Sequence, residues 1–397
     1  MRILLTGATS FLGRHLLQRL LLDGHDIALL LPWSRRDSTK LPLLLEAWYS
    51  PEQVSELLQS RLQIVEGSVK QEGLGLLDAD YERLRRWTEG VVHCAAGLSF
   101  QERYTQGLRL ENILGTEQVL AFVSRSSCRH FHYVSTAYVC GRQQGVVREE
   151  APTDRYGFRN RYEQFKFYAE RLVSDFSRKH NIPTSVYRPG IILENPGSMG
   201  LLQALCLQTD WLVNLRKYLL GTCTIERVRQ GIRFAVAGDP EATLNLVPVD
   251  YCARALACIV TQPDRADYRV YHLINPAPPS MRTLTRSVSE VLGIKAEVVP
   301  ALGPDVAWTT DIEHGLLRKL ERLIYRSYRV YLPYHYDRLA FDDTNTRAAL
   351  HGSGIICPLI DQPFLVQFLQ ARLAKRAQQF LSLLDLATPT LSEGGRG

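Results

Sequence analysis

The strongest constraint on the fold of this chain is a regular alternation of short apolar runs with segments of helical spacing in its first half. The apolar runs have the length of buried strands and lie at residues 2–7, 25–32, 62–68, 91–96, 131–138 and 184–192. Helical patterns separate several of them, most clearly at residues 13–24, 105–125 and 160–180. Strands that alternate with helices in this way predict an α/β fold, with a parallel sheet and helices on both of its faces.

This rhythm changes after residue 196. Residues 201–236 are rich in leucine and have helical spacing. A strand-then-helix pattern returns at residues 244–256, and a further strand is expected at 270–276. Later helices are expected at residues 280–295, 311–331 and 363–386, and residues 387–397 have the composition of a disordered tail. The sequence therefore predicts a first domain that residues 245–275 complete, and a more helical second region.

Composition narrows the class of protein. The 397 residues are 45% hydrophobic and 22% charged, with a formal net charge of +6, which is ordinary for a soluble globular protein. The eight cysteines form no CxxC pair and no cluster with metal-ligand spacing, which predicts reduced thiols in a cytoplasmic protein and no metal site. The first residues read as a strand rather than a secretion signal, and no apolar run is long enough to span a membrane.

The sequence TGATSFLG, residues 6–13, lies where the first predicted strand turns into the first predicted helix. Glycines in such a loop allow a tight turn and a close approach of phosphate, and the helix N-terminus attracts an anion. Gly7 and Gly13 fit the first and last glycine positions, whereas the middle position holds Ser10. A serine there either crowds a bound pyrophosphate or donates a hydrogen bond to it. Taken alone, an ordinary strand-to-helix turn explains this loop equally well.

Four further residues strengthen the interpretation of that loop. The sequence YEQFK places Tyr162 and Lys166 four residues apart on a predicted helix, so that their side chains share one face. A neighbouring ammonium stabilises an ionised tyrosine, which predicts a lowered pKa for Tyr162 and a role as proton donor. Thr136 ends a predicted strand and offers a hydroxyl to a substrate carbonyl, and Asn112 lies in the helical segment before it. The order of the four residues is more informative than any one of them.

Together these motifs resemble those of the extended short-chain dehydrogenase/reductase superfamily, and within it the thioester reductase and fatty acyl-CoA reductase (male-sterility-like) branch. The similar segments are TGATSFLG, GLGLLDADYERL, VVHCAAGLSF, LRLENILGTEQVL, FHYVSTAYVCG, YEQFKFYAERLV, YRPGIIL and LNLVPVDYCARAL, within residues 1–275. The sequence LGL followed by VVHCAA, with Phe100 just beyond, is the part that resembles the acyl-reducing branch.

The resemblance implies an extended Rossmann fold, a doubly wound parallel sheet that binds NADP. This domain is expected at residues 1–195, completed by about 245–275, with a smaller, mainly helical C-terminal substrate domain at 196–245 and 276–386. The cofactor-binding residues that the resemblance implies are Gly7, Thr9, Ser10, Phe11, Leu12, Gly13, Arg35, Arg36, Ser68, Ala95, Ala96 and Pro189.

The resemblance also implies a catalytic set of Thr136, Tyr162 and Lys166, with Asn112 supporting the lysine through a water. Tyr162 would donate a proton to the carbonyl oxygen as the nicotinamide delivers hydride. Lys166 would hold the nicotinamide ribose, and Thr136 would polarise the carbonyl.

The chain departs from the family pattern around the cofactor. Ser10 replaces the middle glycine, and Ser68 stands where an acidic residue commonly touches the adenine. Residues 31–32 are Leu and Pro where an NADP-selecting arginine is common, but Arg35 and Arg36 follow closely. No acidic residue ends that strand to bind a free 2′-hydroxyl. We therefore expect NADPH in preference to NADH.

Three hypotheses for function follow from these residues. The first is an NADPH-dependent reductase of an acyl thioester, carried by CoA or by an acyl carrier protein, or of the derived aldehyde. The second is another enzyme of the same superfamily, a sugar-nucleotide epimerase or dehydratase or a hydroxysteroid-like dehydrogenase. The third is a non-catalytic cofactor-binding protein. Residues 201–236 fit an acyl tunnel with a basic mouth and an ordinary amphipathic helix pair equally well.

Two other features have structural interpretations. The basic, tyrosine-rich stretch within residues 311–331 predicts a packed helix rather than a membrane-surface or nucleic-acid-binding segment. The sequence FDDTN, residues 341–345, predicts a cap for the helix that follows it. The sequence does not specify the acyl chain, the product or the oligomeric state.

Overall fold

The computed structural model describes residues 1–32, 45–46, 48–100, 102–193, 233–262, 267–293, 295–300, 308–310 and 330–371. The chain divides into two compact units. The first contains Met1–Ile192, Glu241–Pro278 and Arg329–Leu359, and the second contains Leu193–Pro240, Pro279–Tyr328 and Ile360–Gly397. The assignment of the C-terminal region to substrate binding stays a prediction.

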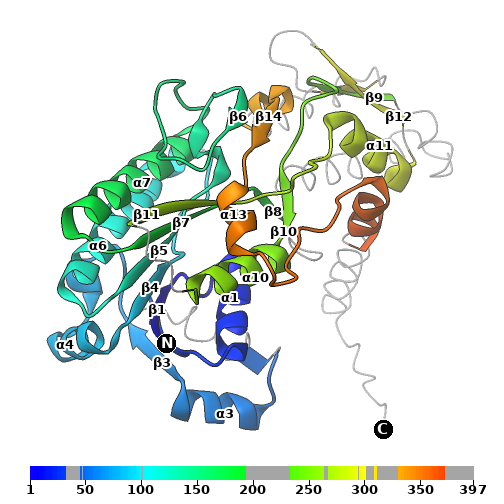
Figure 1. Ribbon diagram of the computed structural model, residues 1–397. Coiled ribbons are helices and arrows are strands. Elements are labelled where there is room, and N and C mark those ends of the chain that lie inside the picture. The colour runs from blue at the N-terminus through cyan, green and yellow to red at the C-terminus, as the bar shows by residue number, and fades with distance from the viewer. Residues whose placement is uncertain are drawn as a thin grey trace, which may run out of the picture. The chain divides into compact units, whose positions relative to one another are not determined.

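A seven-stranded parallel sheet organises the first unit (Figure 1). Its strands are β1 (Arg2–Thr6), β2 (Asp26–Leu31), β3 (Leu62–Glu66), β4 (Gly90–His93), β5 (His130–Val134), β7 (Thr184–Pro189) and β11 (Tyr268–Leu273). Their order across the sheet is β11-β7-β5-β4-β1-β2-β3, and every neighbouring pair is parallel. This is the strand order of a doubly wound Rossmann sheet with one strand added at its edge. The predicted α/β fold is confirmed, because each of these strands overlaps a run predicted as a strand.

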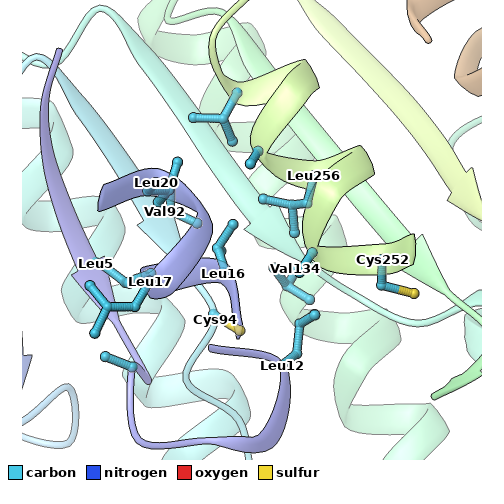
Figure 2. Packing of buried hydrophobic residues seen from close by; sticks show 14 of the residues in the cluster. Leu5, Leu12, Leu16, Leu17, Leu20, Val92, Cys94, Val134, Cys252 and Leu256 are labelled. Carbon is cyan, nitrogen blue, oxygen red and sulfur yellow. The ribbon is translucent and has the colours of Figure 1, made fainter. Parts of the chain in front are cut away.

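Each strand of the sheet sends alternate side chains to two separate hydrophobic layers. From β1, Ile3 and Leu5 join one cluster, whereas Leu4 joins the other. The first cluster packs against helices α1 (Phe11–Leu22) and α10 (Val249–Val260), as Figure 2 shows for residues of both helices. The second packs against α4 (Asp78–Trp87), α6 (Gly115–Arg125) and α7 (Arg161–His180). Helices therefore cover both faces of the sheet, as predicted.

Helix α1 shows how the sequence sets a local boundary. Ser10 caps its N-terminus, and its last turn is followed by Gly24, whose φ of +83° favours glycine. Between them Leu16, Leu17 and Leu20 are fully buried on one face. This apolar face fixes the helix on the sheet directly behind the loop that precedes it.

Shorter elements connect this framework. They are α3 (Pro51–Ser60), η1 (Glu72–Gly75), η2 (Glu102–Tyr104), α5 (Thr105–Arg109), the π-helical η3 (Leu110–Leu114), η4 (Ala137–Cys140), η5 (Leu332–Tyr336) and α13 (Thr344–Ala349). Two small sheets pair β6 (Gly145–Val147) with β14 (Leu339–Phe341), and β8 (Ile191–Leu193) with β10 (Leu246–Pro248). The run predicted as one strand at residues 184–192 is thus divided between β7 and β8.

The second unit contains strands that the sequence did not predict. Strand β9 (Arg233–Ala237) pairs with β12 (Lys295–Val299) and β13 (Trp308–Thr310), and α11 (Met281–Leu292) precedes β12. The prediction of helix up to residue 236 was therefore wrong for β9. Residues 201–232, most of 311–331 and the tail at 387–397 lie outside the described residues. Of the helix predicted at 363–386, residues 362–371 are described and are helical.

The predicted cap at residues 341–345 differs in detail. Asp343 occupies the N-cap position of α13, but its side chain makes no capping hydrogen bond. Asp342 acts instead, because its Oδ1 accepts hydrogen bonds from the backbone N–H and the hydroxyl of Thr344, at 3.3 and 2.6 Å.

The described helices were also compared with the length and apolarity that a bilayer demands. None of them is long and apolar enough to cross a membrane.

We expect the buried face of α1 to carry much of the stability of the first unit. Leu17→Ala should lower the free energy of unfolding by about 2–5 kcal/mol, because it leaves a cavity between α1 and the sheet. Leu22 ends the same helix and is 63% exposed, so Leu22→Ala should change that free energy by less than about 0.5 kcal/mol. Urea unfolding followed by circular dichroism measures both variants, and equal effects would contradict the packing described here.

Candidate active site

The loop between β1 and α1 is closed by two backbone contacts that require glycine. Gly7 has a φ of +75°, and a Cβ on it would lie 2.5 Å from the backbone nitrogen of Ala95. A Cβ on Gly13 would lie 2.0 Å from the carbonyl oxygen of Gly7. These distances are too short for any side chain. Gly7 therefore allows the loop to lie against the segment after β4, and Gly13 allows the first turn of α1 to lie against the loop.

Ser10 has a structural role in this loop. Its Oγ accepts a hydrogen bond from the backbone N–H of Gly13 at 3.1 Å, which makes it the N-cap of α1. The sequence led us to expect that this hydroxyl would either crowd a pyrophosphate or donate to it. The structure adds a third role, because the oxygen already accepts a hydrogen bond from the helix itself.

The first turn of α1 fits an anionic group. The first N–H groups of a helix have no acceptor within that helix, and the Ser10 hydroxyl takes the N–H of Gly13. Those of Phe11 and Leu12 are left at the positive end of the helix dipole, beside the turn that contains Thr9. This donor set suits a pyrophosphate, so the residues present fit a dinucleotide cofactor.

A cavity of about 390 Å³ opens where β2 and β3 end, next to this loop in the sheet order. The residues that line it are Pro32, Glu66, Gly67, Ser68, Gln71 and Gly75. The predicted cofactor residue Ser68 therefore lies in the cavity, where its Oγ also accepts a hydrogen bond from the N–H of Lys70 at 3.2 Å. The sequence did not single out Glu66. Arg35 and Arg36 lie outside the described residues.

Asn112 positions the segment that follows β4. It lies in the π-helical η3, is 1% exposed, and makes two hydrogen bonds to Gly97. Its Oδ1 accepts from the Gly97 N–H at 2.9 Å, and its Nδ2 donates to the Gly97 oxygen at 3.2 Å. The N–H of Ala95 donates to Thr6 Oγ1 at 3.3 Å. Ala95 and Ala96 are thereby held beside the loop between β1 and α1, and both side-chain hydrogen bonds of Asn112 go to Gly97 rather than toward Lys166.

The structure brings Thr136 and Tyr162 together. Thr136 follows β5 at the carboxyl edge of the sheet, and its hydroxyl caps η4 by accepting from the Tyr138 N–H at 3.3 Å. Tyr162 lies in the first turn of α7, which Asn160 caps through the N–H of Glu163 at 3.0 Å. The Thr136 hydroxyl lies close enough to that of Tyr162 to lower the pKa of the tyrosine, so the two hydroxyls are neighbours at the sheet edge.

The predicted direction of the Tyr162 pKa was wrong. Burial raises the pKa of Tyr162 to about 12, the neighbouring Thr136 hydroxyl lowers it slightly, and the nearby Glu163 carboxylate raises it. Lys166 is not among the groups that shift it, because its ammonium is bonded to other partners. Tyr162 is consequently protonated at neutral pH, which is the form a proton donor needs.

Lys166 lies one helical turn after Tyr162 and is buried. Its Nζ donates to the hydroxyl of Tyr133 at 2.9 Å and to the carbonyl oxygen of Val134 at 2.7 Å. Burial lowers the pKa of Lys166 to about 8, and the charge of Glu170 opposes that shift. The lysine therefore loses its proton in a pH range that assays can reach.

Pro189 ends β7, two strands from β4 across the sheet, and is buried. Its neighbour Arg188 forms a buried ion pair with Glu170, which also accepts from the hydroxyl of Ser135 at 2.6 Å. This pair, which the sequence did not reveal, ties α7 to the carboxyl ends of β5 and β7.

Aromatic side chains from the C-terminal part of the first unit complete the site. The ring of Phe100 lies 5.4 Å from that of Tyr162, 5.3 Å from that of Tyr331 and 6.1 Å from that of Tyr334, between ring centroids. Phe100, Tyr162 and Tyr331 are only partly buried. The sequence marked Phe100 but missed Tyr331 and Tyr334, although the aromatic residues crowded into positions 331–336 are a signal for them.

A buried charge network anchors these tyrosines to α7. Arg159 pairs with Glu163 at 3.2 Å and with Asp337 at 2.7 Å, and all three side chains are at most 4% exposed. The hydroxyl of Tyr334 donates to Glu163 Oε1 at 2.6 Å and accepts from Asn160 Nδ2 at 2.8 Å. The N-terminus of α7, next to Tyr162, is therefore held by residues some 170 positions later in the chain.

Comparison with curated proteins finds relatives of which this chain matches only a part. The PKS-NRPS hybrid synthetase cheA of Chaetomium globosum is 30% identical over 215 residues, which are 49% of this chain and 4% of that protein. Fatty acyl-CoA reductase wat of Drosophila melanogaster is 23% identical over 317 residues, which are 71% of this chain and 58% of that protein. The chain thus spans less than two thirds of the length of each.

Solved structures and a family model also match this chain. The terminal R domain from the myxalamid PKS-NRPS biosynthetic pathway superposes with a TM-score of 0.70 and 24% identity, covering 96% of this chain and 91% of that one. At that identity the likeness establishes the fold. Residues 5–256, more than half of the chain, match the model of the family described as male sterility protein. The chain therefore belongs to that family, in the thioester reductase branch of the extended short-chain dehydrogenase/reductases, and is a nicotinamide-dependent oxidoreductase of this type.

Proposed function

We propose that this chain reduces an acyl thioester to an aldehyde with NADPH, and that Tyr162 is the proton donor. The observation that carries the proposal is the neighbouring pair of Thr136 and Tyr162 at the sheet edge, with the buried ammonium of Lys166 one helical turn away. A carbonyl oxygen that accepts from both hydroxyls would be polarised before reaction and stabilised as it gains charge.

The residues of the chain divide the chemistry as follows. The bound cofactor supplies the hydride that adds to the carbonyl carbon. Tyr162, with a pKa raised to about 12, holds its proton until the carbonyl oxygen becomes basic and then donates it. Thr136 donates to the same oxygen. Lys166 would hold the nicotinamide ribose through its buried ammonium.

A thioester substrate accounts for the products and the surroundings of the site. After hydride addition and proton donation, the hemithioacetal hydroxyl would return its proton to the tyrosinate as the carbonyl re-forms. The carbon–sulfur bond breaks in the same step, and the thiolate takes a proton from solvent, which gives aldehyde and thiol. The rings of Phe100 and Tyr331 form an apolar surface beside Tyr162 that suits an acyl chain and limits access of water. The synthetase and acyl-CoA reductase relatives support this substrate class.

The thiol carrier is proposed to be a phosphopantetheine arm, on an acyl carrier protein or on CoA. One related solved structure is a thiolation-reductase di-domain from an archaeal non-ribosomal peptide synthetase, which supports the carrier-bound form. The net charge of +6 also favours an acidic partner. Assays of both carriers with the same acyl group distinguish these sources.

We expect Tyr162→Phe to lower kcat/KM for acyl thioesters by at least about 100-fold, because the variant keeps the ring and loses the proton. Tyr168 lies on the same helix and is 40% exposed, so Tyr168→Phe is the matched control and should retain full activity. NADPH oxidation against acyl-CoA, carrier-bound acyl groups and aldehydes measures both variants. Near-normal turnover by Tyr162→Phe would refute the assignment. Turnover of aldehydes alone would refute the thioester substrate.

The activity should fall as the pH rises through about 8. Lys166 is charged below its pKa, which burial lowers from 10.5 to about 8, so its ammonium is lost above that pH. Tyr162 stays protonated over the same range. The pH dependence of kcat/KM, with circular dichroism at each pH to exclude unfolding, measures this midpoint. A flat profile up to about pH 9.5, well beyond the shifted pKa, would contradict it.

The preference for NADPH is proposed to depend on Arg35 and Arg36. The double variant Arg35→Ala/Arg36→Ala should weaken NADPH binding by about 10- to 100-fold, because it removes charged hydrogen bonds to the 2′-phosphate, and should leave NADH binding nearly unchanged. Arg86→Ala, on an exposed part of α4, is the control. Titration of cofactor fluorescence measures the affinities. Glu66 makes this test decisive, because it lines the cavity where β2 and β3 end, and a carboxylate there would disfavour a 2′-phosphate and favour NADH.

A further inference from the structure

Tyr133 is the direct partner of the buried lysine. Its hydroxyl accepts a hydrogen bond from Lys166 Nζ at 2.9 Å, and its ring centroid lies 4.5 Å from the same atom. The oxygen and the π-face of one side chain thus both contact the ammonium. Tyr133 lies on β5 and is 1% exposed, so solvent does not compete for these contacts.

The hydroxyl of Tyr133 is held in turn by the helix that carries Asn112. The side chain of Thr116 lies close enough to the Tyr133 hydroxyl to lower its pKa, and the Thr116 hydroxyl donates to the carbonyl oxygen of Asn112 at 2.7 Å. Thr116 also contacts His93 Nε2 at 3.2 Å. A continuous chain of buried side chains therefore connects Lys166 to the Asn112 carbonyl. From sequence we expected a water in that place.

This chain leaves one N–H of the ammonium for the active site. An ammonium has three N–H donors, and Tyr133 and Val134 accept two of them. Among the described residues, no further hydrogen-bond acceptor for Lys166 Nζ was found. Because Tyr133 and Val134 hold two of the N–H groups, the tetrahedral geometry of the ammonium sets the direction of the third.

The other charged and titratable groups around Lys166 act at longer range. Cys94 follows β4, and burial raises the pKa of its thiol to about 11, so it is neutral where Lys166 titrates. Glu170 lies one turn further along α7, and its charge favours the protonated amine. Glu170 is already paired with Arg188. His93 on β4 is neutral, because burial and the charge of Lys166 lower its pKa to about 3. The direct hydrogen bonds of Lys166 are therefore those to Tyr133 and Val134.

We propose that Tyr133 is a positioning residue for Lys166, which keeps the ammonium charged and directs its remaining N–H toward the cofactor ribose. This inference rests on the proposed role of Lys166 in catalysis. It assigns to a side chain on β5 the bridging role that the family resemblance gives to a water. Because the bridge is built into the fold, it is present whether or not cofactor is bound.

The test removes the hydroxyl and keeps the ring. In Tyr133→Phe the charged amine loses one acceptor, so Lys166 should release its proton about one pH unit lower than in the parent. The chain has eight lysines, so lysine-selective 13C labelling allows this titration to be followed by NMR on the full chain without cofactor, with Lys166→Met identifying the signal. The alkaline limb of kcat/KM should move by the same amount, and the rate at about pH 8 should fall roughly fivefold.

Tyr187→Phe is the matched control. Tyr187 lies on the neighbouring strand β7, is fully buried, and its hydroxyl is bonded to His132 Nδ1 at 2.9 Å. This variant deletes an equivalent hydroxyl without touching Lys166, and should leave the titration and the pH profile unchanged. Thr116→Val, which removes the partner of the Tyr133 hydroxyl, provides a second route and should shift the titration in the same direction by less.

An unchanged Lys166 titration in Tyr133→Phe, or an equal shift in Tyr187→Phe, would overturn the inference. Failure of the proposed function gives a different result. If Lys166→Met retains full activity, the catalytic role of the lysine is wrong, while the NMR titration still decides whether Tyr133 holds its charge.

Discussion

All seven strands of the large sheet run in the same direction, and this one constraint brings the segments that follow its strands to one edge. The chain leaves β1, β4, β5 and β7 at the same edge of the sheet. Gly7, Ala95, Thr136 and Gly190 are therefore brought to one edge although more than 180 residues separate the first from the last. The glycines and alanines at these points let backbones approach closely, and the hydroxyl adds chemistry to the same edge. The parallel pairing of the strands thus sets where these segments lie, and their side chains add the chemistry.

Ser10 shows how a departure from a motif is accommodated. The oxygen of Ser10 satisfies one N–H at the start of α1, which a glycine could not do. The helix is therefore capped by its own chain, and the turn needs no bound anion to complete it. The same hydrogen bond leaves one fewer backbone donor for a phosphate. Compared with a glycine at position 10, Ser10 leaves the loop one fewer donor for an anion but caps the turn without one.

The large sheet could be predicted from sequence because its strands are buried on both faces and appear as continuous apolar runs such as LLLP at residues 29–32. The small strand β9 could not be predicted, since its pairing partners β12 and β13 lie more than 50 residues away. The pairing of Tyr162 with Lys166 on one helix face was readable from their spacing. Their partners were not readable, because Tyr133 lies on β5 and Thr136 just after it, far from α7 in sequence. Burial also reversed the expected direction of the Tyr162 pKa shift. Local patterns thus identified the residues, and tertiary contacts decided their protonation.

The network of Arg159, Glu163, Tyr334 and Asp337 has a consequence for the order in which the site is built. Tyr162 and Lys166 are synthesised early, but Tyr334 and Asp337, which pair with Glu163 and Arg159 at the start of α7, come after residue 330. Until they arrive, Arg159 and Glu163 have each other but lack Asp337 and Tyr334, which share their buried charges in the finished protein. A chain still emerging from the ribosome therefore carries Tyr162 and Lys166 without the surroundings that hold them, and the start of α7 is completed only after some 170 further residues have been made.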